Sequence, residues 1–241
     1  MKPLKALVRE AGNWYIRRLC AAESENQQFR HHNERPVEFR FALESLSRVR
    51  PKTVLDVGTG TTAWPHLLRN CGFVVTAIDN VRDYWTRGMV NRHWTVLDAD
   101  ITKPDNSAVG KGPFEAVTCI SVIEHIADHE SAVRNMLRML VPGGMLIITT
   151  PYSHHNYDPN VYQRPDCSYG NKLPYPCRSH SVREIEQWER LGARLNRREL
   201  WRMFSGPVWT AGERVSWERV ESEDAPHQLG CFEFEKANEK Q

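Results

Sequence analysis

The most informative segment of this chain is TVLDVGTGTT, at residues 53–62. Its first half, residues 53–57, predicts a short buried strand, and the glycines that follow predict a tight turn into a helix. A Cβ atom at Gly58 or Gly60 would forbid the backbone angles of such a turn or collide with a bound molecule. Because a turn of this kind brings backbone N–H groups close to a ligand, the stretch predicts a cofactor site.

The composition excludes several classes of protein. The chain has 241 residues with 40% hydrophobic and 26% charged residues, which is ordinary for a globular protein. With 32 basic and 30 acidic residues, no overall charge favours nucleic acid or an anionic membrane as a partner. We see neither an apolar run of the roughly 20 residues that span a bilayer nor a secretion signal, and we expect a cytoplasmic protein. The six cysteines form no C-x-x-C pair, which favours reduced thiols over disulfides or a zinc site.

Strand and helix patterns alternate after the glycine turn. Four further apolar runs predict strands, at residues 73–78, 93–97, 114–122 and 145–150. Between the last two, apolar residues at helical spacing predict a helix over residues 131–140, which Pro142, Gly143 and Gly144 follow. This alternation predicts right-handed crossovers within one parallel sheet.

Acidic residues follow the second and third predicted strands. Asp79, with Asn80 after it, lies about 20 residues beyond the glycine turn, where a carboxylate accepts hydrogen bonds from both hydroxyls of a ribose. Asp98 and Asp100 follow the third strand. We favour Asp100 as the acceptor for an adenine amine, with Ile101 packed on the ring, and keep Asp98 as the alternative.

Five segments together carry a resemblance to a known family: residues 54–60, 77–79, 98–101, 114–126 and 140–144. In this order they resemble the class I S-adenosylmethionine-dependent methyltransferases, within the small-molecule group. The resemblance implies a Rossmann-like α/β fold, with a mostly parallel seven-stranded sheet, helices on both faces and an antiparallel C-terminal edge strand. It implies S-adenosyl-L-methionine as cofactor, with contacts from Asp56, Gly58, Thr59, Gly60, Asp79, Asn80, Asp100, Ile101 and Ser121. The family often has a third glycine where this chain has Thr62.

Two other functions fit part of the sequence. An NAD(P)-binding oxidoreductase is one, since residues 58–63 satisfy G-x-G-x-x-A and Asp79 suits an NAD ribose. Against it, Asp56 suits the ammonium group of methionine, directly or through backbone and water, and would face a pyrophosphate unfavourably. Asp100 and the Pro-Gly-Gly segment also favour the methyltransferase. A catalytically inactive S-adenosylmethionine-binding module is the other alternative.

Candidates for catalysis follow the fourth and fifth strands, where the carboxyl edge of the sheet opens. His125 lies just beyond the fourth strand, and Tyr152, His154 and His155 follow the fifth. Any of them could remove a proton from a hydroxyl or amine acceptor. A divalent-metal site that combines Glu124 with these histidines is an alternative, but we expect no metal.

We expect residues 1–50 to form an N-terminal helical cap and residues 51–241 the methyltransferase domain. Within it, the proline- and tyrosine-rich residues 152–180 predict a substrate-recognition insertion. Alternating Phe and Glu near residues 230–235 predict a strand with one buried face, paired with a strand near residues 195–204. The expected partner is a small polar acceptor, such as a sugar or natural-product hydroxyl, with no nucleic acid and no membrane. The oligomeric state stays open.

Overall fold

The computed structural model describes residues 2–25, 33–104, 109–168 and 175–237. They form two compact units, Met1–Val37 and Glu38–Gln241. The first unit contains helix α1 (Lys2–Glu25) and the first residues of α2 (Arg35–Val49). The chain is therefore helical at residues 2–25 and 35–49, whereas residues 26–32 lie outside the described part.

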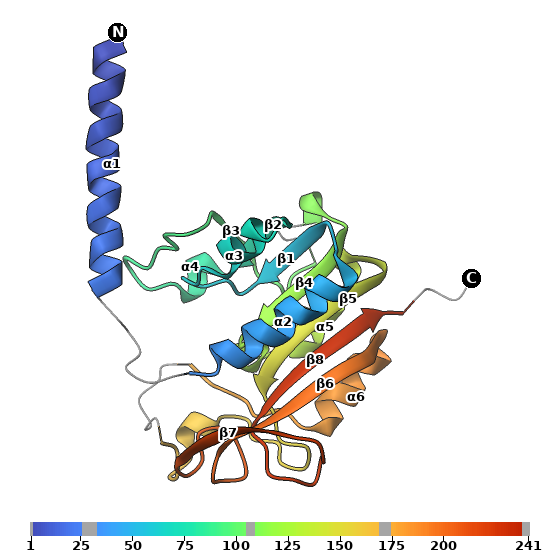
Figure 1. The fold of residues 1–241 in the computed structure, drawn as a ribbon. Helices are drawn as coiled ribbons and strands as arrows, with labels where there is room; N and C mark the ends of the chain where they lie inside the picture. The colour runs from blue at the N-terminus through green and yellow to red at the C-terminus, as the bar shows by residue number, and fades with distance from the viewer. Residues whose placement is uncertain (1, 26–32, 105–108, 169–174, 238–241) are drawn as a thin grey trace. The chain divides into compact units, whose positions relative to one another are not determined.

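The second unit contains one sheet of eight strands in the order β3-β2-β1-β4-β5-β8-β6-β7 (Figure 1). Five strands run parallel to one another: β1 (Thr53–Val57), β2 (Val74–Asp79), β3 (Val96–Asp98), β4 (Phe114–Ile120) and β5 (Leu140–Pro151). Three C-terminal strands join through antiparallel pairs: β6 (Ala193–Phe204), β7 (Arg214–Val220) and β8 (Leu229–Lys236). This confirms the Rossmann-like α/β fold.

Helices cover both faces of this sheet. They are α2, α3 (Trp64–Asn70), α4 (Val81–Tyr84), α5 (His129–Met139) and α6 (Val182–Arg190), with 3₁₀ turns η1 (Val109–Lys111), η2 (Ile123–His125) and η3 (Val161–Gln163). Neighbouring residues of a strand point to opposite faces. In β8, Glu233 pairs with Arg48 of α2, whereas Phe234 contacts Trp188 of α6. Helices α2 and α6 therefore lie on opposite faces.

The sheet differs from the expected one in its C-terminal half. It has eight strands rather than seven, because residues 214–220 form an additional strand, β7, at the edge. Strand β8 is antiparallel as expected, but it lies between β5 and β6. Because β8 lies inside the sheet, the expectation that only one of its faces is buried was wrong. Glu233, on the face expected to be exposed, is 2% exposed and pairs with Arg48.

The region between β2 and β3 contains little regular structure. Helix α4 is four residues long, and β3 comprises three residues rather than the five expected. Beyond α4 the chain runs through residues 85–95 without a further helix or strand. Side chains of α4 and of the segment after it are thus left beside the carboxyl ends of β1 and β2, where the pocket lies.

Candidate functional site

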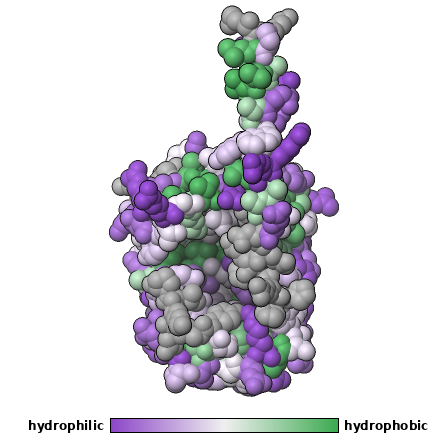
Figure 2. Space-filling view, turned by 90° about the vertical axis from the view of Figure 1, so that its left-hand side faces the viewer, coloured by the Kyte–Doolittle hydropathy of each residue, from purple (hydrophilic) through white to green (hydrophobic). Residues whose placement is uncertain are grey.

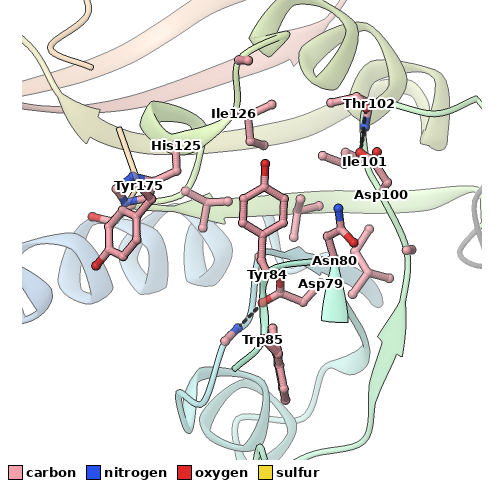
Figure 3. Close-up of a pocket in the computed structure, with 18 of the residues that line it drawn as sticks. Asp79, Asn80, Tyr84, Trp85, Asp100, Ile101, Thr102, His125, Ile126 and Tyr175 are labelled. Atoms are coloured by element: carbon pink, nitrogen blue, oxygen red, sulfur yellow. Dashed lines mark hydrogen bonds between the residues drawn. The ribbon is translucent and has the colours of Figure 1, made fainter. Parts of the chain in front are cut away.

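A pocket of about 690 Å³ opens at the carboxyl ends of β1 to β4 (Figure 3). Strands β1 and β4 are neighbours although they are not consecutive, so the chain order reverses at this point, where α/β sheets bind ligands. The lining residues are Val57, Gly58, Gly60, Ile78, Asp79, Asn80, Tyr84, Trp85, Thr86, Met89, Ala99, Asp100, Ile101, Thr102, Ser121, Val122, His125, Ile126, Ala127, Asp128 and Tyr175. Eight of the residues singled out from the sequence are among them.

The glycine turn forms the floor of the pocket. Gly58 has φ of 74° and Gly60 has φ of 55°, a region that L-residues with a Cβ rarely adopt. A Cβ at Gly58 would lie 2.3 Å from Val122 Cγ1, whereas a Cβ at Gly60 would meet no protein atom within 4 Å. Gly58 is therefore required for packing of the β1 turn against the β4 turn, and Gly60 leaves open space beside the pocket.

We expect Gly58→Ala to lower the free energy of unfolding by about 2–4 kcal/mol, because left-handed strain and overpacking against Val122 add. Gly60→Ala is the matched control and should cost about 1–2 kcal/mol, from backbone strain alone. Urea denaturation measures both. Equal losses for the two variants would show that the contact with Val122 does not matter.

Asp79 ends β2 and closes the turn from the other side. Its Oδ2 accepts a hydrogen bond from Gly60 N–H at 2.7 Å. Burial raises the pKa of the Asp79 carboxyl above its ordinary value, and hydrogen bonds from Gly60, Trp85 and Asn80 lower it in part. The carboxylate thus lies in the pocket wall beside Asn80, held by the same turn that would carry a cofactor.

Asp56 and Thr59 do not line the pocket. Asp56 is 3% exposed, and its carboxylate accepts hydrogen bonds from the hydroxyls of Thr59 at 2.6 Å and Thr118 at 2.8 Å. The two residues therefore fix the glycine turn to β4 from within the protein. Any influence of Asp56 on a bound methionine group would act through the backbone of this turn.

Asp100 and Ile101 form the wall at the end of β3. Asp100 Oδ1 accepts hydrogen bonds from Thr102 N–H at 2.9 Å and from Thr102 Oγ1 at 2.7 Å, which orients its carboxylate. Ile101 is 5% exposed, and its carbonyl accepts from Asn135 of α5 at 2.9 Å. Asp100 and the apolar Ile101 thus lie side by side in the pocket wall, as the sequence predicted. Asp98, the alternative, lies outside the lining and forms an ion pair with Arg82.

Ser121 occupies the end of β4 in a left-handed conformation, with φ of 49°. Its hydroxyl donates to Glu38 Oε1 at 2.5 Å, and Thr149 Oγ1 donates to the same oxygen at 2.6 Å. Glu38 is fully buried. No local sequence pattern indicates this carboxylate, because it comes from the helix that precedes β1 and meets Ser121 only through the fold.

Glu38→Ala would leave the fully buried Thr149 hydroxyl and the half-buried Ser121 hydroxyl without this acceptor. We expect the free energy of unfolding to fall by about 2–3 kcal/mol, the usual penalty for such groups. Glu38→Gln retains one acceptor oxygen and should lose less. Urea denaturation of both variants tests this, and an alanine variant as stable as the wild-type protein would exclude a supporting role for Glu38.

His125 ends η2 and lines the pocket beside Tyr175, with ring centroids 4.9 Å apart in an edge arrangement (Figure 3). Its Nδ1 lies 2.7 Å from the carbonyl oxygen of Pro176. Because a carbonyl can only accept, Nδ1 carries the proton in this contact. The acceptor nitrogen of the neutral ring is then Nε2, which lies 3.7 Å from Glu124 Oε1.

The other three catalytic candidates do not line the pocket. Tyr152 is buried against His227 and Phe232, and burial raises the pKa of its hydroxyl. Its hydroxyl lies 3.0 Å from His154 Nδ1. Strand β5 pairs with β8 as far as Pro151, so the residues that follow β5 lie beside β8 and not beside β1 and β4.

His154 and His155 face acidic residues near the C-terminal strands. His154 Nε2 lies 3.4 Å from Glu223, and His155 Nε2 lies 3.1 Å from Asp224. Glu124 and His125 belong to η2 and have other partners, since His125 Nδ1 meets the Pro176 carbonyl and His125 Nε2 lies 3.7 Å from Glu124. Within the described ranges, no group of three or more His, Cys, Asp or Glu residues is arranged to hold a metal ion.

Among its described residues, the expected insertion contributes Tyr175 to the pocket. Residues 169–174, which include Tyr169, lie outside the described part of the chain. Tyr162 is buried and Tyr157 is exposed, and neither lines the pocket. The bridge between Asp158 and Ser179 closes the segment on itself.

Several lining residues carried no clear signal in the sequence. Tyr84, Trp85 and Met89 follow β2, where the pattern allowed either helix or loop. Figure 3 shows the ring of Tyr84 directed toward Ile126. Val122 was the fourth such residue, and the contact that identifies it is its approach to Gly58. Tyr84, Trp85 and Met89 lie here because α4 ends after four residues, which the sequence pattern did not indicate.

Comparison with known proteins gives a consistent result. The family model of the methyltransferase domain matches residues 29–207. A ubiquinone biosynthesis O-methyltransferase of Coxiella burnetii is 24% identical over 169 residues, which are 65% of this chain and 69% of that protein.

Solved structures share the fold. N-methyltransferase NodS from Bradyrhizobium japonicum, in complex with S-adenosylhomocysteine, superposes with a TM-score of 0.53 at 15% identity, over 84% of this chain and 87% of its own. The 1,6-didemethyltoxoflavin-N1-methyltransferase of Burkholderia thailandensis, with its substrate and S-adenosylhomocysteine bound, gives a TM-score of 0.55 at 15% identity, over 95% and 90%.

Proposed function

Because the chain belongs to the class I S-adenosylmethionine-dependent methyltransferases, we propose that it methylates a small polar acceptor, such as a sugar or natural-product hydroxyl. The observation that carries this proposal is the pocket in which the glycine turn, Asp79 and the Asp100–Ile101 pair converge. In this proposal Asp79 binds the ribose hydroxyls, and Asp100 with Ile101 binds adenine.

The cofactor supplies an activated methyl group on a sulfonium. The protein must hold the acceptor oxygen in line with the bond that breaks and take up the hydroxyl proton. We assign His125 as the base that takes up the hydroxyl proton. Its Nδ1–H is held by the Pro176 carbonyl, so Nε2 is the nitrogen that can accept the proton. The Tyr175 ring packs against this imidazole and restricts its rotation.

The expectation of a small-molecule acceptor is supported by the nearly balanced charge and by the substrate named for the Burkholderia enzyme. The lining is largely apolar, with aromatic side chains from Tyr84, Trp85 and Tyr175. Such a wall suits an acceptor that presents one hydroxyl on an apolar or ring-shaped body. The cytoplasm, where the cofactor is made and thiols stay reduced, is the location that we propose.

A methyl-transfer screen tests the proposal. The protein is incubated with radiolabelled S-adenosylmethionine and separate pools of sugars, phenols, other hydroxylated metabolites and amines, and S-adenosylhomocysteine is quantified with the labelled product. We expect stoichiometric product in a hydroxyl-containing pool. Transfer only to amines would contradict the hydroxyl assignment, and binding without turnover in every pool would favour an inactive binding module.

A further inference from the structure

Helix α1 lies outside the region that the methyltransferase family model matches, which begins at residue 29. Its side chains are sorted by character: in Figure 2, apolar side chains of the column at the top gather on one side and hydrophilic ones on the other. An addition to a catalytic domain that exposes apolar side chains indicates a contact surface.

The apolar side of α1 forms a continuous stripe. Leu4, Leu7, Val8, Trp14 and Tyr15 recur at intervals of three, four and seven residues, which places them on one face of a helix. Each is between 59% and 69% exposed. Two of the five are aromatic residues with a polar tip, the type that is enriched at the boundary between water and lipid.

The net charge of α1 is positive. The helix contains five basic residues, Lys2, Lys5, Arg9, Arg17 and Arg18, and three acidic residues, Glu10, Glu23 and Glu25. Since the chain has 32 basic and 30 acidic residues in all, the remainder holds 27 of each. The excess of positive charge in the chain therefore resides in this helix, and its partner should be anionic.

We propose that α1 docks on an anionic lipid surface, with the apolar stripe in the interface and the basic side chains against the headgroups. A helix that combines a basic face with exposed Leu, Val and Trp binds lipid in this way. Among the described residues, no helix has the length and apolar character needed to cross a membrane, but a helix that lies in the interface needs one apolar face only. The cytoplasmic leaflet supplies the negative surface.

A second copy of the chain is the competing occupant of the stripe. Each of two such helices would carry a net positive charge, and like charges repel. Arg18 lies on the stripe with its guanidinium 5.1 Å from the Trp14 ring centroid. On a lipid surface its long side chain can reach the headgroups, whereas between two helices its charge would be buried.

Flotation of the full chain with lipid vesicles tests the proposal. We expect binding to vesicles of phosphatidylcholine with phosphatidylglycerol, and at least tenfold weaker binding to phosphatidylcholine alone, because the attraction between the basic side chains and the anionic headgroups is lost. High salt should weaken binding to the anionic vesicles. Leu7→Gln should lower the partition coefficient about tenfold, since a buried leucine side chain is lost.

Ile16→Gln is the matched control. Ile16 is an apolar residue of the same helix, 57% exposed, but it lies on the basic side, and we expect a change within about twofold. Glutamine keeps a helix propensity close to that of leucine, so neither variant should unfold α1. Absence of vesicle binding, equal binding to both vesicle types, or equal loss in the two variants would overturn the proposal. So would a lipid-free dimer in sedimentation equilibrium that Leu7→Gln dissociates.

Discussion

Asp79→Ala is expected to weaken binding of S-adenosylmethionine and S-adenosylhomocysteine by about 100-fold or more. The substitution removes the carboxylate at the end of β2, and with it the two charge-assisted hydrogen bonds that we assign to the ribose, each worth roughly 1.5–3 kcal/mol. The Gly60 N–H, which donates to Asp79 at 2.7 Å, would also lose its acceptor. Titration calorimetry of the purified variant measures the loss.

Asp98→Ala is the control for this change. Asp98 ends the neighbouring strand β3, lies outside the pocket and pairs with Arg82 at 2.7 Å. An exposed ion pair of this kind contributes little, so affinity should stay within about twofold of the wild-type value. Wild-type affinity in Asp79→Ala, or an equal loss in Asp98→Ala, would contradict the ribose assignment.

The pH dependence of binding follows from the same carboxyl. Burial raises the pKa of Asp79, and the ribose hydroxyls donate to its ionised form. A proton therefore competes with the cofactor at a higher pH than at an exposed aspartate. Affinity should be constant above the raised pKa and fall about tenfold per pH unit below it. Asp79→Asn should remove this dependence.

His125→Ala is expected to lower kcat about 100-fold, at the lower end of what a general base contributes. Cofactor affinity should change by no more than about threefold, because the assigned role concerns the acceptor proton. In the pH profile of kcat, the decline toward acid should disappear in the variant. Single-turnover and steady-state assays with the acceptor found in the screen provide both readouts.

His154→Ala and His155→Ala are the controls for His125. Both were candidates from the sequence, but their rings face Glu223 and Asp224 rather than the pocket. We expect kcat within about threefold of wild type in each. If either variant lost much of its kcat while His125→Ala stayed active, the proton acceptor would be one of these two histidines and not His125.

The side of the pocket that we assign to the cofactor was predictable because short-range sequence signals coincide there. The glycines after β1 and the acids after β2 and β3 each mark the carboxyl end of a parallel strand, and such ends meet at one edge. Gly58, Gly60, Asp79 and Asp100 therefore lie together as the spacing indicated.

The positions of the residues that we expected around the acceptor depend on contacts between residues distant in sequence. Tyr152 directly follows β5, and its place on a pocket wall was a reasonable expectation, but its N–H donates to Gln228 because β8 continues beside β5. Glu38 reaches Ser121 across 83 residues of sequence, and Glu233 is buried because Arg48 meets it. No local pattern reports such contacts, since a carboxylate in a sequence gives no sign of the partner that allows its burial.

Calorimetry of the wild-type chain with S-adenosylmethionine, S-adenosylhomocysteine and NAD in separate titrations is the sharpest test of the cofactor assignment. We expect one-to-one binding of both adenosyl compounds and no heat from NAD. Binding of NAD, with neither adenosyl compound taken up, would contradict it.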